Sequence, residues 1–236
     1  MGLAFAHRFA RAGHHVAIMD IYGEAMDRAV QVLSVHEGEV LSIPSDVSDE
    51  ESVIQAFGVV LERWGQVDAL INCAGVACNV PTADLTLRAW RQTLEINQTG
   101  VVLCSRELAR RHIDGEAVII NVSSMYGEVA APNRLAYCAT KSAVAMMTRV
   151  LAIEWADQGI RVNAVAPGYI DTPFLQKLVK DERVDLARIR SRTPLSRLGT
   201  PEEIADLVFF IASPENRYMT GQVVTSDGGW SAYGYL

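Results

Sequence analysis

A tyrosine and a lysine four residues apart are the pair in this sequence best suited to proton transfer. Tyr137 and Lys141 fall within residues 135–157, whose pattern predicts a helix, so the two side chains lie on one face of it. A nearby ammonium favours the ionised form of a phenol, so we expect the pKa of Tyr137 to be lowered. Such a group is a general acid or base near neutral pH. Ser124 can place a hydroxyl beside this phenol if the loop before the helix folds back.

Because this spacing also arises by chance, the pair is a weak motif alone, and its context must support it. Apolar runs and helical periodicity alternate along the chain. We expect strands at 15–19, 40–43, 67–71, 117–120, 160–166 and 222–225, helices at 2–12, 24–34, 49–64, 87–111, 135–157 and 201–212, and an irregularly helical insertion at 172–192. This alternation predicts an α/β fold with a doubly wound parallel sheet, helices on both faces, and a single domain over residues 1–236.

Polar or glycine-containing segments follow five of the expected strands. In parallel sheets, ligands bind at the carboxyl ends of the strands, so these segments predict a nucleotide-sized crevice. The segments are Asp20, Asp46-Val47, Asn72 to Gly75, Ser123-Ser124 and Pro167-Gly168.

Asp20 bears on the choice of nucleotide. An acid at the end of this strand can accept hydrogen bonds from both hydroxyls of an adenosine ribose, and its charge repels a 2′-phosphate. Asp20 therefore favours NAD over NADP. The simpler alternative is that Asp20 caps the segment that follows it.

Composition excludes several classes of function. A net charge of −7 and a pI near 5.3 argue against nucleic acid or anionic membrane as a partner. No apolar run approaches the roughly 18 residues that cross a bilayer. The four cysteines form no C-x-x-C pair and no cluster with histidine, which favours reduced thiols in a cytoplasmic protein with no metal site.

Taken together, these motifs resemble the short-chain dehydrogenase/reductase family over essentially the whole chain. The resemblance rests on N-x-A-G at 72–75, Asn97 in a long helix, S-S…Y-x-x-x-K ending at Lys141, R-V-N-x-x-x-P-G at 161–168, and T-G-Q…D-G-G at 220–229. The resemblance implies that Tyr137 is the acid/base and that Lys141 holds the nicotinamide ribose and lowers the pKa of Tyr137. It also implies that Ser124 binds the substrate oxygen and that Asn97 supports a proton path.

The resemblance further implies a set of cofactor contacts. They are Gly2, Asp20, Asp46, Val47, Asn72, Ala74, Gly75, Tyr137, Lys141, Pro167, Gly168, Ile170 and Thr172.

The sequence departs from this family at its start. The family opens with a strand and T-G-x-x-x-G-x-G, whose amides cradle the pyrophosphate, and here Gly2 matches only the last glycine. In the family's strand order the first strand lies at the centre of the sheet, between the strands ending at Asp20 and Ile71. We therefore expect this chain to begin inside a longer natural protein. Cys73 also replaces the family's usual second Asn, which is not catalytic.

The resemblance and Asp20 together predict NAD(H)-dependent oxidation of a secondary alcohol, such as a polyol, a sugar or a hydroxy-acid. One alternative is a reductase of the 3-oxoacyl-carrier-protein type, which Asp20 disfavours. Another is a non-catalytic folded partner that lacks the phosphate loop. The helices expected at 87–111 and 135–157 are apolar on more than one face, which fits burial between subunits, and the resemblance implies a homotetramer.

Overall fold

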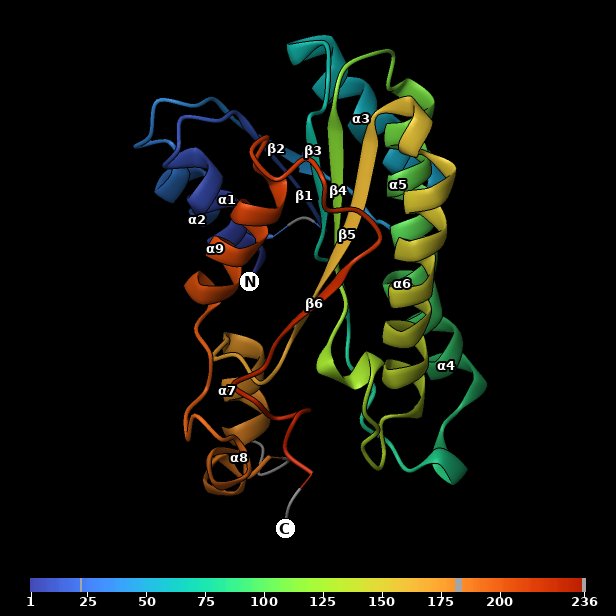
Figure 1. Ribbon diagram of the computed structural model, residues 1–236, viewed down its shortest axis with the longest axis vertical. Coiled ribbons are helices and arrows are strands. Elements are labelled where there is room, and N and C mark those ends of the chain that lie inside the picture. Colours follow the sequence, from blue (N-terminus) through green and yellow to red (C-terminus); the bar gives the residue numbers. More distant parts are fainter. Residues whose placement is uncertain (22, 181–183, 235–236) are drawn as a thin grey trace.

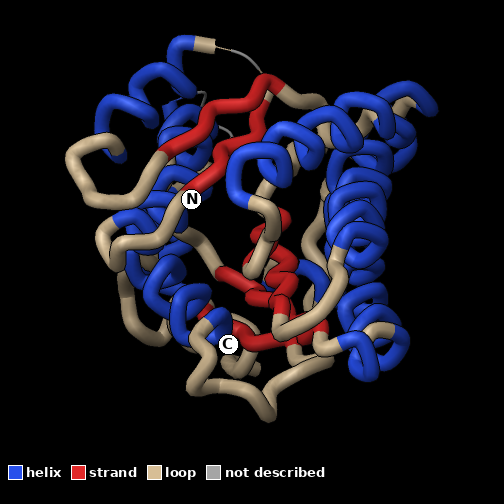
Figure 2. The backbone as a smooth tube through the Cα atoms, turned by 90° about the horizontal axis from the view of Figure 1, so that it is seen from above, coloured by secondary structure: helices blue, strands red, loops and turns tan. Residues whose placement is uncertain are grey.

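The strands form two parallel sheets. The computed structural model describes residues 1–21, 23–180 and 184–234. Within that part, β1 and β2 pair in one sheet, and the other sheet has the order β3-β4-β5-β6. Figure 2 shows the two groups of strands as separate. The bounds are β1 Val16–Asp20, β2 Val40–Pro44, β3 Ala69–Asn72, β4 Ala117–Val122, β5 Ile160–Pro167 and β6 Val223–Ser226.

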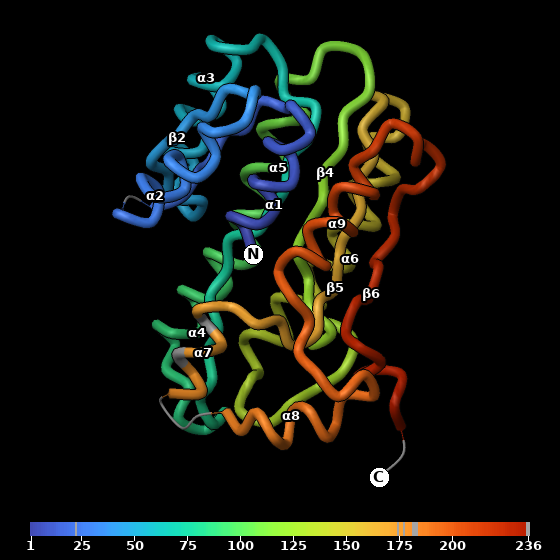
Figure 3. The backbone as a smooth tube through the Cα atoms, turned by 90° about the vertical axis from the view of Figure 1, so that its left-hand side faces the viewer, coloured from blue at the N-terminus to red at the C-terminus, as the bar shows by residue number. Residues whose placement is uncertain are grey.

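Helices cover both faces of the strands (Figure 1). On one side are α1 (Gly2–Ala10), α2 (Glu24–Leu33) and α9 (Pro201–Ala212), and on the other are α3 (Glu50–Trp64), α5 (Gly100–Arg111) and α6 (Leu135–Glu154). Beyond the carboxyl ends of the strands, α7 (Pro173–Lys180) and α8 (Leu186–Arg192) extend the molecule, while α4 (Leu87–Leu94) packs on α6 (Figures 1 and 3). Shorter segments are Thr82–Asp84, Glu95–Thr99, Met125–Gly127 and Ala156–Gln158. No described helix is long and apolar enough to span a membrane.

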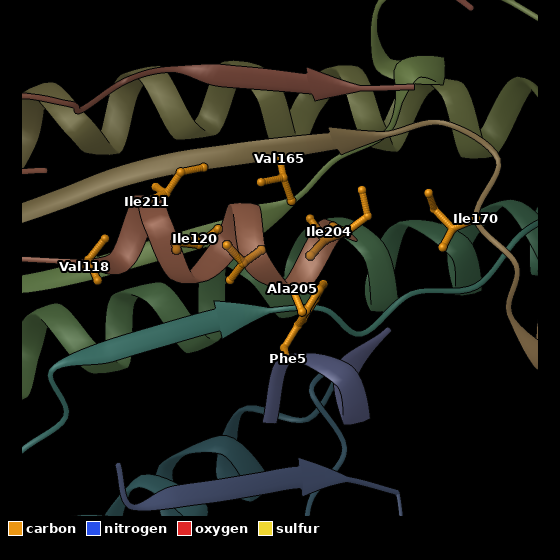
Figure 4. Close-up of a cluster of buried hydrophobic side chains, with 10 residues drawn as sticks. Phe5, Val118, Ile120, Val165, Ile170, Ile204, Ala205 and Ile211 are labelled. Carbon is orange, nitrogen blue, oxygen red and sulfur yellow. The ribbon is translucent and has the colours of Figure 1, made fainter. Parts of the chain in front are cut away.

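An apolar core on each face fixes the sheet that carries the functional residues. Figure 4 shows Phe5 of α1 and Ile204 and Ile211 of α9 beside Ile120 of β4 and Val165 of β5. Every residue of β4 is buried, as expected for a strand covered on both faces. The opposite core joins α3, α5 and α6 to the same strands. The carboxyl end of β4 is therefore held rigidly from both sides.

The α/β fold predicted from the sequence, with parallel strands and helices on both faces, is confirmed. The strands form two sheets, and the break lies between β1 and β3, where the resemblance places the strand that this sequence lacks. The predicted helix at 87–111 was wrong in one respect, because a π-helical segment, Glu95–Thr99, separates α4 from α5. The insertion expected at 172–192 contains α7 and α8, and residues 181–183 of it lie outside the described residues.

Candidate active site

The first two turns of α6 bring Tyr137 and Lys141 together at the end of β4. The Lys141 Nζ atom lies 5.7 Å from the centroid of the Tyr137 ring. Nζ also donates a 2.6 Å hydrogen bond to the carbonyl oxygen of Val122, the last residue of β4. Because Lys141 is only 4% exposed, burial lowers its pKa to about 8. The ammonium is thus fixed in place by the strand beneath the helix.

The expected lowering of the Tyr137 pKa was wrong for this structure. Burial is the largest effect on this phenol, and it raises the pKa above the ordinary value of 10.0. A hydrogen bond from Ser124 and the charge of Arg134 both act to lower it, but they do not overcome the loss of solvent. The sequence places the charges next to the phenol but does not show how deeply the phenol is buried.

The loop after β4 folds back onto α6. Ser124 caps the short helix Met125–Gly127, where its Oγ accepts a 3.1 Å hydrogen bond from the amide of Tyr126. The neighbouring Ser123 donates from its Oγ to the carbonyl of Lys141 at 2.9 Å. The second contact holds the loop against α6, and the Ser124 hydroxyl forms a hydrogen bond with the Tyr137 phenol.

Hydrogen bonds of Asn97 connect the segment after β3 to α6. Asn97 is fully buried within the π-helical segment. Its Oδ1 accepts from the amide of Val76 at 2.7 Å, while its Nδ2 donates to the Val76 carbonyl at 2.9 Å and to the Thr140 hydroxyl at 3.2 Å. A Cβ added at Gly75 would lie 3.3 Å from Asn97 Oδ1 and 3.7 Å from Lys141 Nζ. Gly75 therefore lies directly against both side chains, and a larger residue would be tightly packed there.

The side chain of Asn72, which begins the segment expected to line the cofactor, is part of a buried hydrogen-bond network. Its Nδ2 donates to the Asn121 side-chain oxygen at 2.8 Å and to the Ser105 hydroxyl at 3.0 Å. Asn121 in turn donates to the Thr148 hydroxyl at 2.9 Å. This buried network ties β3, β4, α5 and α6 together beneath the site. The signal for it was the presence of amides and hydroxyls inside apolar elements.

The two acidic residues expected at the adenosine end both accept hydrogen bonds from the residues that follow them. Asp20 is exposed at the carboxyl end of β1, and one of its oxygens accepts from the amide of Ile21 at 2.8 Å. Asp46 uses one oxygen to accept from the amide and the hydroxyl of Ser48, which lowers the pKa of Asp46. Each carboxylate therefore stabilises its own turn through one oxygen, as the capping alternative for Asp20 expects, and the other oxygen of each makes no hydrogen bond within the part of the chain that the structure describes.

The tail of β5 passes very close to the chain after β6. Pro167 ends β5, and a Cβ added at the following Gly168 would lie 2.6 Å from the Cα of Asp227. Only glycine permits this approach. Ile170, 7% exposed, lies just beyond, and Thr172 caps the start of α7. These residues follow the carboxyl end of β5, which lies beside the carboxyl end of β4 that Lys141 contacts.

Three further residues expected to contact the cofactor, Gly2, Ala74 and Val47, lie in α1 and in the segments after β3 and β2. Gly2 begins α1, and a Cβ added there would lie 3.8 Å from the Sγ of Cys73 in the segment after β3. Ala74 is exposed in the same segment. Val47 packs on Gly100 of α5, where an added Cβ would lie 2.8 Å from Val47 Cγ2. Tails from β2 and β3 thus meet α1 and α5 at one edge of the molecule.

A group of residues that the sequence did not single out surrounds Arg134. Its guanidinium carbon lies 4.8 Å from the ring centroid of Tyr126 and 5.9 Å from that of Tyr169. The two tyrosine hydroxyls are 2.8 Å apart, and Trp230 packs edge-on against Tyr169. The available signal was an arginine three residues before the tyrosine of the Y-x-x-x-K motif.

The residues present fit a nicotinamide dinucleotide. An ammonium carries three N–H groups, and the hydrogen bond of Lys141 to Val122 uses one of them. No carboxylate of the described residues pairs with Lys141, although it is buried. Gly75, which is exposed, lies beside this ammonium. A sugar with two hydroxyls satisfies such donors, and Asp20 suits a second sugar.

The comparisons with known proteins agree with this geometry. A family model described as "Enoyl-(Acyl carrier protein) reductase" matches residues 1–231. The cis-4-hydroxycyclohexanecarboxylate dehydrogenase of Sinomonas cyclohexanicum is 39% identical over 98% of this chain and 92% of its own length. The 2,5-dichloro-2,5-cyclohexadiene-1,4-diol dehydrogenase of Sphingobium indicum is 34% identical over 98% of this chain and 92% of its own.

Solved structures are equally similar. The crystal structure of a putative gluconate dehydrogenase from Agrobacterium tumefaciens has a TM-score of 0.92 and 31% identity, covering 98% of this chain and 92% of that one. A short-chain dehydrogenase from Bacillus anthracis has a TM-score of 0.89 and 32% identity, covering 100% of this chain and 93% of that one. The fold and site define an oxidoreductase that acts on CH–OH groups. The chain belongs to the short-chain dehydrogenase/reductase family.

Proposed function

We propose that this protein is an NAD-dependent dehydrogenase that oxidises a secondary alcohol to a ketone. The observation that carries the proposal is the arrangement at the carboxyl end of β4, where a buried ammonium, a phenol and a serine hydroxyl lie together. These are the groups needed to hold an alcohol oxygen and to accept its proton.

Each residue then has a defined role. Ser124 hydrogen-bonds the substrate oxygen, and the Tyr137 phenolate oxygen takes the hydroxyl proton. Lys141 binds the hydroxyls of the nicotinamide ribose, and its charge favours the Tyr137 phenolate. Asn97 holds the segment at Val76 so that the backbone at Gly75 stays clear of the ribose. The cofactor supplies the hydride acceptor when it is bound.

Asp20 supports NAD as the cofactor. Its exposed carboxylate lies at the end of β1, where a 2′-phosphate would meet a like charge. Replacing Asp20 with Ser should increase kcat/KM for NADP by at least about tenfold while lowering it for NAD. Unchanged kinetics with both cofactors would remove Asp20 from the proposal.

The activity is tested with purified protein, NAD and a panel of secondary alcohols, following NADH absorbance. Because two of the relatives are dehydrogenases named for compounds with a hydroxyl group on a six-membered carbon ring, the panel includes hydroxycyclohexanes beside polyols, sugars and hydroxy-acids. Acyl thioesters with NADH test the reductase alternative. Tyr137→Phe should lower the rate by about 10²-fold or more, whereas the control Tyr218→Phe, at a fully exposed position, should not. Equal rates for the two variants would refute the mechanism.

We also propose a homotetramer located in the cytoplasm. Apolar side chains lie exposed along the outer side of α6, at Met146, Val150 and Ile153, and at Val102 of α5. A second copy of the chain would bury them. Light scattering should give four times the chain mass, and Ile153→Glu should reduce it, since Ile153 is 80% exposed. A monomer at all concentrations would contradict the assembly.

A further inference from the structure

Arg134 occupies a position from which it reaches the reacting end of the site. It is the residue that precedes α6, three residues before Tyr137. The charge of its guanidinium acts on the Tyr137 phenol in the direction that lowers its pKa, although burial raises that pKa overall. A substrate whose hydroxyl contacts Tyr137 is therefore within the electrostatic influence of this guanidinium.

Aromatic rings hold this guanidinium without neutralising it. The guanidinium lies over Tyr126, and one of its nitrogens is 3.5 Å from the Tyr169 hydroxyl, at the limit of a hydrogen bond. No carboxylate of the described residues lies within 4.0 Å of it. By contrast, Arg197 in the same region pairs with Glu203. Arg134 is thus positioned by stacking, and its planar donors remain open to a ligand.

The surroundings favour an anion carried on a compact apolar body. Tyr126 is buried, which raises its pKa, so its hydroxyl is neutral and does not compete as an anion. The rings of Tyr169 and Trp230 pack edge-on at 5.2 Å and extend the aromatic wall away from Arg134. A carboxylate is the group that best matches the two parallel N–H donors of a guanidinium.

We propose that Arg134 binds a carboxylate of the substrate. The substrate is then a hydroxy-carboxylate on a small carbon skeleton. This proposal rests on the proposed function as an alcohol dehydrogenase. The carboxylate is unchanged in the reaction. The C–H bond of the carbinol carbon breaks with its electron pair passing to the nicotinamide of NAD, the O–H proton passes to Tyr137, and a keto-carboxylate and NADH result. Arg134 determines specificity and takes no part in bond making.

The test compares cis-4-hydroxycyclohexanecarboxylate with its methyl ester, which keeps the ring and hydroxyl but has no charge. The unmodified enzyme should prefer the acid by about 10- to 100-fold in kcat/KM, mainly through KM. Arg134→Gln should abolish this preference, and Arg134→Lys should restore part of it because a point charge lacks the planar fork. Arg149→Gln removes the same charge from an exposed position on α6 and should leave the preference unchanged.

The ratio of acid to ester separates binding from a structural effect. If Arg134→Gln lowered turnover of both compounds equally, Arg134 would act only by supporting the fold or Tyr137, and the proposal would be overturned. An unmodified enzyme with no preference for the acid would overturn it as well.

A binding measurement tests the carboxylate site separately from the proposed oxidation of an alcohol. Calorimetry with cyclohexanecarboxylate, which has no hydroxyl to oxidise, should show binding to the unmodified protein and about tenfold or more weaker binding to Arg134→Gln. That outcome supports the carboxylate site even if no alcohol in the panel is oxidised. Equal binding to both proteins counts against it even if alcohols are oxidised.

Discussion

The buried charge of Lys141 destabilises the folded protein, and replacing Lys141 with Met should remove this destabilisation. Met keeps most of the length and apolar volume of the lysine stem but carries no charge. The ammonium is 4% exposed, and burial lowers its pKa from 10.5 to about 8. The difference of about 2.5 between the two values corresponds to about 3 kcal/mol against the charged folded state.

The pH dependence gives the sign of this effect. Between about pH 8 and 10.5 the unfolded chain retains the Lys141 proton that the folded chain has lost, so the contribution of Lys141 to stability rises with pH. Below about pH 8 both states are protonated and the full cost remains. The unmodified protein should therefore gain about 2 kcal/mol relative to Lys141→Met between about pH 7 and about pH 9.5.

Urea denaturation at several pH values measures this difference, and subtraction of the two curves cancels all other titrating groups. At about pH 7, Lys141→Met should be the more stable protein, by less than about 3 kcal/mol because the hydrogen bond to Val122 is lost. It should also be inactive. Lys180→Met, at an exposed site on α7, is the control and should show no such trend. A pH-independent difference between Lys141→Met and the unmodified protein would refute the reasoning.

Three further changes test the geometry of the site. Ser124→Ala removes a hydrogen bond that lowers the pKa of Tyr137, so the pH at which alcohol oxidation is half-maximal should move upward, and a pH–rate profile that did not move would contradict this. Asn97→Ala leaves the amide and the carbonyl of Val76 without their side-chain partner, so it should lower both the activity and, by about 1–3 kcal/mol, the stability in thermal denaturation. Unchanged stability would show that these hydrogen bonds do not hold the segment in place. Gly168→Ala should cost about 1–3 kcal/mol by urea denaturation because its Cβ would meet backbone, whereas Gly58→Ala, open and helical, should gain about 0.5–1 kcal/mol. Equal effects of the two glycine substitutions would disprove the close approach.

The local elements and their order were predictable because they depend on patterns within short stretches of the chain. Strands buried on both faces appear as continuous apolar runs, and the covering helices show periodic apolar positions. The structure places nearly all of their ends within two or three residues of the expected positions. The π-helical segment around Asn97 was not predictable, since it depends on hydrogen bonds to Val76 and Thr140 far along the chain.

The sequence determined by itself which side chains share a helix face and which segments follow strands. Those relations are fixed by the geometry of one helix or strand, so Tyr137 and Lys141 lie together as expected. Only the tertiary structure decided how far each group is removed from water. Burial reverses the expected direction of the Tyr137 pKa, turns Asn72 into a structural amide, and brings Arg134 against the ring of Tyr126. Desolvation arises from all the elements packed around a group, and no short stretch of sequence contains that information.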